Sequence, residues 1–262
     1  MKKIFIIIPF FTIFMMGQSL SGSDGNEEIN NSEKYIVNEC FEGVSRKIFS
    51  FNQVLDKSIF EPVSKAYVKL PQPIRMGTSN VISNISNLTT IPNNLLQGEL
   101  KEAGQNTVRF IVNTTVGILG LFDPANKMGL KTKGKEDYGQ TLGTWGTKSG
   151  CYFVMPIIGP TTVRDVTGSA FSLLGGDPWY NVTVRNTSTN FTDADYYFSR
   201  TANALDFRAK NIESFDSLER NSVDFYASIK SLYLQDRNKK INNSNSITET
   251  QIDSDWEEIE TK

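Results

Sequence analysis

Few residues in this sequence could do catalytic chemistry, because histidine is absent from all 262 residues. Its absence excludes Ser-His-Asp and Cys-His nucleophilic catalysis and histidine-based metal sites within the chain. Asp165, Asp193 and Asp195 could pair as acid and base, but their spacing does not require it, and surface or helix-capping roles are expected. We therefore predict no catalytic residue.

The two cysteines, Cys40 and Cys151, are far apart in the sequence. They could form one disulfide in an oxidising compartment, or stay unpaired and buried, and the sequence does not decide between these states. Two cysteines cannot supply the four thiolates of a structural zinc site, so no metal site is predicted.

One segment has most of a phosphate-binding motif. Residues 129–136 read GLKTKGKE, but Glu136 stands where a P-loop has Ser or Thr and no strand precedes the segment, so we expect a solvated basic turn. Lys and Arg number 27 against 29 Asp and Glu, which gives no clustered basic face for nucleic acid. The sequence predicts neither a cofactor nor a nucleic-acid partner.

The densest run of unusual residues is the stretch from Glu136 to Asp165, with glycines at 139, 143, 146, 150 and 159. It could be a catalytic loop, or a tightly turned segment whose backbone approaches another surface, because glycine allows positive φ and adds no side-chain bulk. Without histidine or a phosphate-binding hydroxyl, the second interpretation is favoured.

Apolar residues recur at helical spacing along the body of the chain, and strand-like alternation is scarce, so the sequence predicts an all-α fold. Phe41, Val44, Ile48, Phe51 and Leu55, for example, would share one helix face. The other predicted helices are 61–70, ended by prolines 71 and 73, then 81–88, a short one after Pro92, and 108–122, 163–174, 193–212 and 216–236.

The predicted helix from Val108 to Phe122 is apolar over much of its circumference. Fifteen residues at about 1.5 Å each make roughly 22 Å, which is too short to cross about 30 Å of hydrocarbon. The segment is therefore either a central buried helix or an element that reaches halfway into a membrane.

The N-terminus has the three parts of a secretory signal: Lys2 and Lys3, an apolar core from Ile4 to Met16, and small residues after it. Ser23 stands where a bacterial lipobox has its lipidated cysteine, so the mature chain is either released or held at a membrane by its own apolar surface. We predict a signal peptide over 1–22, a flexible spacer over 23–36, a helical domain over 37–238 and a disordered acidic tail over 239–262.

From Phe41 to about Gly168 the chain resembles the MlaA (VacJ) family, the outer-membrane component of a bacterial lipid-asymmetry system. The blocks that carry the resemblance occur in order: FEGVSRKIFSFNQVLD, PVSKAYVKLPQPIRMGTSN, NNLLQG, RFIVNTTVGILGLFDPA, DYGQTLGTWG and MPIIGPTTVRD. Two positions depart from the family: Ser23 replaces the lipidated cysteine, and Cys151 stands where members usually carry proline.

The resemblance implies a ring of short amphipathic helices, embedded in the inner leaflet of the outer membrane, with a central amphipathic channel. Its implied function is non-enzymatic: phospholipids misplaced in the outer leaflet pass through the channel towards the inner membrane. The implied partners are phospholipids, a trimeric outer-membrane porin and a periplasmic lipid-carrier protein, and the implied location is the periplasmic side of the outer membrane. Two other functions remain open, an exported helical protein that binds lipid or membrane without transport, and a lipid hydrolase that uses Ser or Asp without histidine.

With this resemblance, we expect certain apolar, aromatic and glycine residues to face the lipid path or the membrane. Trp145 and Tyr152 suit a membrane–water boundary, where aromatic rings with a polar edge are favoured. The full set of candidates is Phe49, Phe51, Asn52, Val108, Ile111, Val112, Val116, Leu119, Gly143, Trp145, Gly146 and Tyr152.

Overall fold

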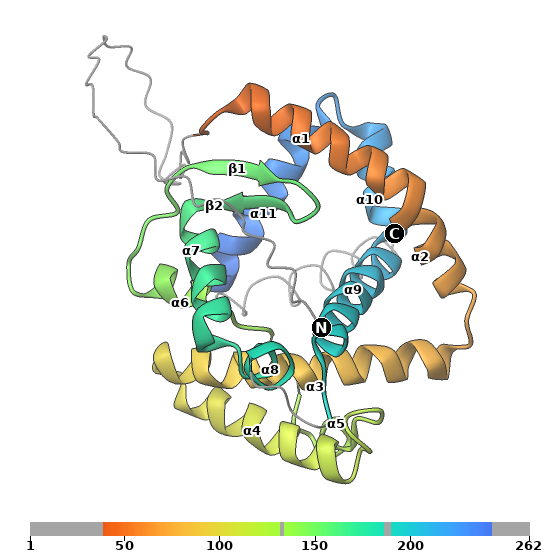
Figure 1. Ribbon diagram of the computed structural model, residues 1–262, viewed down its shortest axis with the longest axis vertical. Coiled ribbons are helices and arrows are strands. Elements are labelled where there is room, and N and C mark those ends of the chain that lie inside the picture. The colour runs from red at the N-terminus through yellow and green to blue at the C-terminus, as the bar shows by residue number, and fades with distance from the viewer. Residues whose placement is uncertain (1–38, 132–133, 186–189, 243–262) are drawn as a thin grey trace, which may run out of the picture. The chain divides into compact units, whose positions relative to one another are not determined.

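The computed structural model describes residues 39–131, 134–185 and 190–242. The predicted signal peptide over 1–22, the spacer over 23–36 with Ser23, and the predicted tail from residue 243 onward lie outside this described part. The described residues belong to one compact unit, Val37–Lys262. They fold mainly into helices, which confirms the predicted all-α class (Figure 1).

The elements before residue 130 are helical. They are α1 (Glu42–Leu55), the π-helical turn η1 (Asp56–Phe60), α2 (Glu61–Val68), α3 (Gln72–Leu96), α4 (Leu100–Thr115) and α5 (Pro124–Lys127). The prolines at 71 and 73 separate α2 from α3 as predicted, because proline disfavours helical geometry in the residue before it.

The later elements include one β-hairpin. They are α6 (Tyr138–Thr144), β1 (Tyr152–Met155), β2 (Gly159–Thr162), α7 (Val163–Phe171), η2 (Ser172–Gly176), α8 (Pro178–Tyr180), η3 (Asn181–Arg185), α9 (Asp193–Lys210), α10 (Ile212–Asn221) and α11 (Phe225–Ile241). Side chains of Asp137, Thr162 and Asp224 accept backbone N–H groups at the starts of α6, α7 and α11.

Contacts between elements close a ring within this unit (Figure 1). α1 leads through η1 to α2, α2 packs on α9, and α9 packs on α3. α3 contacts α4 and α6, α6 contacts α7, and α7 leads back through β2 and β1 to α1. The ring-like arrangement expected for this chain is therefore present.

The hairpin was not predicted. β1 and β2 pair antiparallel, with Tyr152 opposite Thr162 and Met155 opposite Gly159. Its strands are only four residues long, and β2 contains Gly159 and Pro160, so the sequence shows little of the alternation that predicts a strand.

Several helix boundaries also differ from prediction. α3 runs continuously through Pro92, where a break was expected, and α11 continues to Ile241, past the predicted domain end at residue 238. The expected helix over 216–236 is divided between α10 and α11 by a short break, after which Asp224 caps α11. The expected helix over 108–122 begins earlier, at Leu100, and ends at Thr115.

A small hydrophobic core joins α1, the hairpin and α11. It contains Phe49, Tyr152, Val154 and Tyr226. The Phe49 ring meets the Tyr226 ring edge to face, with centroids 5.4 Å apart. This core holds α1, the hairpin and α11 together on one side of the ring.

Candidate functional site

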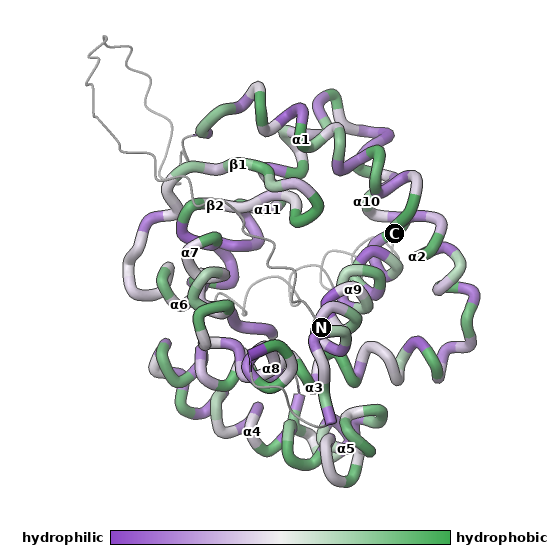
Figure 2. Tube along the Cα trace, viewed as in Figure 1, coloured by the Kyte–Doolittle hydropathy of each residue, from purple (hydrophilic) through white to green (hydrophobic). Residues whose placement is uncertain are grey.

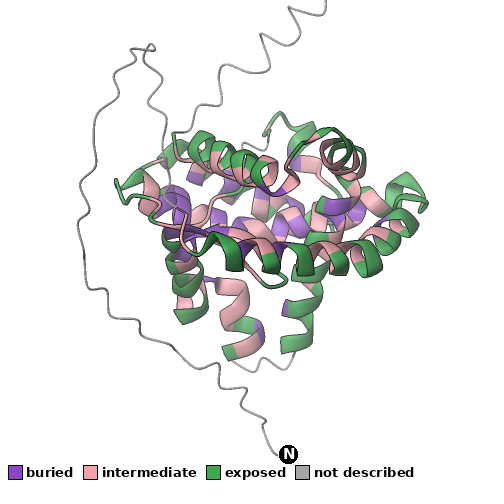
Figure 3. Cartoon of the chain, turned by 90° about the horizontal axis from the view of Figure 1, so that it is seen from above, coloured by how far each residue is buried: buried purple, intermediate pink, exposed green. Residues whose placement is uncertain are grey.

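The distribution of polar and apolar side chains is the reverse of that in a water-soluble protein. Among the described residues, buried polar and charged side chains outnumber buried hydrophobic ones. Many large hydrophobic side chains are instead exposed. Hydrophobic positions occur along all the main helices (Figure 2), and much of the helical surface belongs to exposed residues (Figure 3). Large exposed apolar patches mark protein or membrane interfaces.

The exposed apolar side chains gather on helix faces and at the tips of turns. They are Val44, Phe51 and Val54 on α1, Leu100, Val108 and Ile111 on α4, Val116, Ile118 and Leu119 after α4, Ile157 and Ile158 in the hairpin turn, and Phe171, Leu173 and Leu174 around the end of α7. An unpartnered apolar stripe of this kind is expected for helices that lie in a membrane surface.

Polar side chains form the seam between α3 and α4. Asn84 Nδ2 donates to Thr114 Oγ1 at 2.9 Å, and Asn106 Nδ2 donates to Asn94 Oδ1 at 2.9 Å. Hydrogen bonds of this kind join helices in lipid, where the hydrophobic effect cannot drive helix association. The seam suits two helices whose outer faces contact an apolar medium.

The segment 116–122 is a rigid apolar turn rather than the predicted end of a helix. Ile118 and Leu119 adopt left-handed backbone conformations with φ 54°, and Gly120 follows at φ 89°. A Cβ at Gly120 would lie 2.5 Å from the Asn84 Cβ, so only glycine fits against α3 there. Leu119 remains 69% exposed at the tip.

Buried polar side chains hold the base of this turn. Arg109 Nη2 and Asn113 Nδ2 each donate to the Asp123 carboxylate at 2.9 Å. The same carboxylate accepts the Asn126 N–H at the start of α5. Asn80 Nδ2 donates to the Leu121 carbonyl at 3.2 Å. The exposed apolar tip is therefore fixed to α3 and α4.

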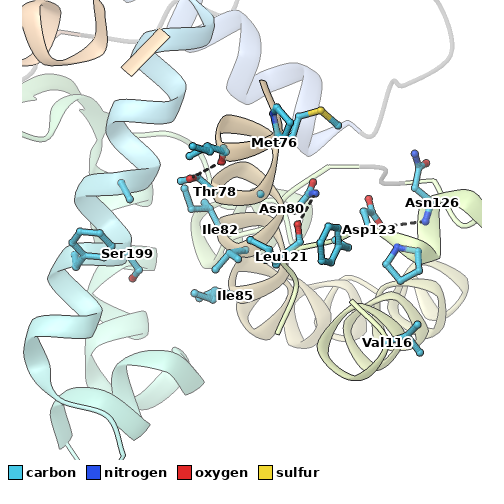
Figure 4. A pocket seen from close by; sticks show the side chains of 18 of the residues that line it. Met76, Thr78, Asn80, Ile82, Ile85, Val116, Leu121, Asp123, Asn126 and Ser199 are labelled. Carbon is cyan, nitrogen blue, oxygen red and sulfur yellow. Dashed lines mark hydrogen bonds between the residues drawn. The ribbon is translucent and has the colours of Figure 1, made fainter. Parts of the chain in front are cut away.

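A cavity of about 1190 Å³ lies beside this turn (Figure 4). Its walls come from the first half of α3, the segment 116–127, and α8 and α9. Most of the lining is apolar, including Met76, Ile82, Ile85 and Leu121, while Asn80, Asp123, Asn126 and Lys127 add polar groups. A cavity of this size and chemistry suits an elongated apolar molecule with a polar end.

An ion cluster, buried at Asp165, nearly buried at Arg237 and half-exposed at Asp137, joins α6, α7 and α11. Arg237 donates to the Asp137 carboxylate at 2.6 and 2.9 Å and to Asp165 Oδ1 at 2.7 Å. Burial opposes the charge on Asp137, but the Arg237 hydrogen bonds outweigh it and lower its pKa to about 2. The Tyr233 hydroxyl also donates to Asp165. Both carboxylates of this cluster are therefore paired with Arg237.

This cluster corrects one sequence-based expectation. Asp165 was expected at the surface or in a capping role, but its side chain is buried and paired with Arg237. Asp195 does form a capping box with Thr192 at the start of α9, and Asp193 lies in the first turn of that helix. The capping expectation is thus confirmed for Asp195.

Two glycines of the stretch from Glu136 to Asp165 lie in close contact with other elements. A Cβ at Gly139 would lie 2.6 Å from Asp165 Oδ1, and a Cβ at Gly143 would lie 2.6 Å from Ile241 Cδ1. Gly168, just after the stretch, faces Gly139 across the contact between α6 and α7. These contacts fit the interpretation of this stretch as a tightly turned segment whose backbone approaches other elements, and not as a catalytic loop.

The structure separates the predicted lipid-facing residues into exposed and buried groups. Phe51, Val108, Ile111, Val116, Leu119, Trp145 and Gly146 are exposed, and Val112 and Gly143 are half-buried. Asn52 is half-buried and fixes the hairpin, donating to the Met155 carbonyl and accepting the Ile157 N–H. A lipid-facing role for these residues stays a prediction.

The expectation was wrong for Tyr152, which is 0% exposed, and Phe49 belongs to the same core. Both rings pack against α11, which covers them, so these side chains lie in the core and not at the surface. Trp145 does lie at the surface, and its indole N–H donates to the Leu96 carbonyl at 2.9 Å.

Sequence reasoning missed the cavity wall supplied by α9. Asp195, Phe198, Ser199 and Ala202 line the cavity at spacings of three, four and seven residues, which is one helix face. This spacing was visible in the sequence, but nothing there indicated which element the face would meet.

Cys40 and Cys151 form a disulfide, with their Cα atoms 5.4 Å apart. This answers the question that the sequence left open. The Cys40 N–H also donates to the Tyr152 carbonyl, so the start of the ring is joined to β1 twice.

Neither a metal site nor a membrane-spanning helix occurs in the part of the chain that the structure describes. No three or more Asp, Glu or Cys side chains gather there in a way that could hold a metal ion. None of the helices described is both long enough and apolar enough to cross a bilayer.

Comparisons with known proteins agree on one family. The model of the MlaA lipoprotein family matches residues 37–240. An intermembrane phospholipid transport system lipoprotein of Haemophilus influenzae is 30% identical over 226 residues, covering 81% of this chain and 84% of that protein. The Escherichia coli protein with the same description is 30% identical, covering 86% and 83%. An uncharacterized Rickettsia bellii protein is 34% identical, covering 83% and 82%.

One solved structure has the same fold. It was described under the words "Structural basis for maintenance of bacterial outer membrane lipid asymmetry". It aligns with a TM-score of 0.68 at 29% identity, covering 78% of this chain and 99% of the solved chain.

Proposed function

The chain belongs to the MlaA lipoprotein family, and we propose that it moves phospholipids out of the outer leaflet of the bacterial outer membrane towards the inner membrane. Its ring of helices lies in the inner leaflet, on the periplasmic side. The lipid passes through the ring without a chemical step. The names of the relatives support a role as a component of an intermembrane phospholipid transport system.

One observation carries the proposal: large apolar side chains are exposed on the helix faces, while most of the buried side chains among the described residues are polar or charged. Each large apolar side chain transferred from water into hydrocarbon contributes about 1.5–3 kcal/mol, so the exposed faces of α1 and α4 favour a membrane strongly. The polar groups that line the cavity, among them Asn80, Asn126 and Lys127, would give a charged headgroup partners that hydrocarbon cannot offer. A phospholipid has the same division between apolar chains and polar head.

Partners and anchoring follow from this location. A trimeric porin would hold the ring in the outer membrane, and a periplasmic carrier protein of the same system would receive the lipid. Because Ser23 replaces the lipidated cysteine, the apolar turn at 116–122 and the helix faces supply the membrane attachment. The disulfide between Cys40 and Cys151 supports an oxidising compartment such as the periplasm.

The test uses a bacterial strain that lacks its own family member. Phospholipid on the cell surface is measured with a membrane-impermeant amine reagent, and the protein is followed by membrane fractionation. Expression of this chain should restore a low surface phospholipid level. If the chain stays in the membrane and the surface level does not fall, the protein binds membranes without transporting lipid, and the proposal is wrong.

A single variant tests the membrane placement. Leu119→Asp puts a carboxylate at the exposed tip, where its insertion into hydrocarbon costs about 2.5–3.5 kcal/mol, and Asp tolerates the left-handed backbone better than Leu. The membrane-bound fraction should fall while the fold persists. Lys148→Asp, at an exposed position in the loop after α6, is the matched control and should stay bound. Equal retention of both variants would place the apolar turn outside the membrane.

A further inference from the structure

A small polar pocket adjoins the apolar cavity. Its volume is about 30 Å³, and it shares Ile82, Ile85, Trp179 and Ser199 with the larger cavity. The residues that only the small pocket has are polar or charged: Ser86, Thr89, Asp177, Arg200 and Asn203. An apolar space therefore leads directly into a polar one, with α9 forming a wall of both.

Cations surround the polar end. Lys135 Nζ donates to Asn203 Oδ1 at 3.4 Å, and Arg200 donates to Asp177. The Asp177 carboxylate is already engaged, because it also accepts the Trp179 and Tyr180 N–H groups at the start of α8. Lys210, one turn beyond Asp206 on α9, pairs with that residue.

Lys135 differs from these neighbours. Its hydrogen bond is to a neutral amide, and among the described residues no carboxylate lies within ion-pair distance of its ammonium group. Desolvation by the surrounding protein is the main cause that lowers the pKa of Lys135 from its ordinary value, and the charge of Lys210 adds to it, while the nearby Asp206 carboxylate acts in the opposite direction. A cation that is reachable from solvent and forms no ion pair with a described carboxylate is suited to bind an anion.

We propose that this polar pocket, lined by Arg200 and Asn203 and flanked by Lys135, holds the phosphate of a phospholipid whose acyl chain occupies the adjoining cavity. The inference rests on the proposed transport function and adds a specific holding site to it. The cavity walls Ile82, Ile85 and Phe198 contact the acyl chain. Lys135 and Arg200 meet the phosphate at the mouth of the small pocket, and Asn203 orients Lys135.

Lipid binding is measured with the purified chain in detergent micelles. The probes are a fluorescent phosphatidylglycerol and a fluorescent diacylglycerol with the same acyl chains, which lacks the phosphate. Lys135→Gln should weaken phosphatidylglycerol binding about tenfold, since it removes a charge-assisted hydrogen bond, and leave diacylglycerol binding unchanged. Lys135→Arg should retain most of the affinity, and Lys148→Gln should behave like the unmodified chain.

A second variant tests the acyl-chain cavity. Ala202 lines the cavity on α9, and Ala202→Trp fills part of it. This change should weaken both probes to a similar extent. Circular dichroism of each variant checks that the helices remain.

The outcomes separate the inference from the proposed function. Equal phosphatidylglycerol affinity for the Lys135→Gln variant and the unmodified chain overturns the phosphate site, even where transport in cells is intact. In a further arm, inorganic phosphate is titrated by calorimetry. If phosphate binds in a way that depends on Lys135, and phosphatidylglycerol does not compete with it, the site belongs to free phosphate and the headgroup assignment is overturned. Failure to lower surface phospholipid in cells rejects the transport function instead, whatever the micelle experiment shows.

Discussion

Removing the disulfide should destabilise the ring strongly. Cys40 and Cys151 are 111 residues apart in sequence, and the loop they close contains α1 to α6. Loop closure of this length restricts the unfolded chain by about 5 kcal/mol in the chain-entropy model. For a domain of this size, each kcal/mol shifts the midpoint of thermal unfolding by about 2–4 °C, so the double variant Cys40→Ser, Cys151→Ser should unfold about 10–20 °C lower.

The measurement is thermal unfolding in detergent, followed by circular dichroism. Both cysteines are replaced together, because one remaining thiol could pair between molecules. The unmodified chain treated with dithiothreitol is the control, and it should unfold at the temperature of the double variant. A shift below about 3 °C would refute the reasoning, because it would mean that the Glu39–Tyr152 bridge and the Phe49 core alone hold the start of α1 on β1.

Two further predictions concern the contacts of the stretch from Glu136 to Asp165. Gly168→Ala places a Cβ 2.3 Å from the Gly139 backbone nitrogen and should lower the free energy of unfolding by about 1–3 kcal/mol. Gly104→Ala is the control: its Cβ would point into open space in α4, so this variant should be neutral or slightly stabilising. Equal effects of the two variants would show that α6 and α7 can separate freely. Burial raises the pKa of Glu136 to about 7, above its value of about 4.5 in the unfolded chain, so the folded state binds the proton more tightly and stability should fall as pH rises between these values. The change should be about 1–2 kcal/mol, given the solvent around the carboxyl, and Glu136→Gln should remove it in unfolding curves recorded from pH 4.5 to 7.5.

Local patterns in the sequence were enough to predict the elements whose boundaries depend on local chemistry. The apolar spacing from Phe41 to Leu55 predicted α1, because one face of a helix is set by residues three and four apart. The prolines at 71 and 73 marked the boundary between α2 and α3, because their effect on the backbone is local. Pro92 misled for the same reason: the packing of α3 against α4 and α6 holds the helix together around it, and this packing is not local.

The features that remained hidden depend on distant residues. The apolar run from Val116 to Phe122 has a helical composition, but Gly120 must pass close to Asn84, and Asp123 is held by Arg109 and Asn113, so the chain turns there. Tyr152 is of a residue type that is favoured at a membrane–water boundary, but it is covered by α11, which lies more than 70 residues further along the chain. The cavity combines faces of α3 and α9, and their meeting is a property of the ring as a whole.

The polar seam and the apolar surface depend on each other. In water, a seam built on Asn84, Asn94 and Asn106 would add little to stability, because water competes for each amide. Against hydrocarbon there is no such competitor, and the hydrophobic effect no longer holds α3 and α4 together, so interhelical hydrogen bonds must do so. The exposed apolar face of α4 and the asparagine-bonded face that it turns to α3 are therefore both consistent with an apolar environment around these helices.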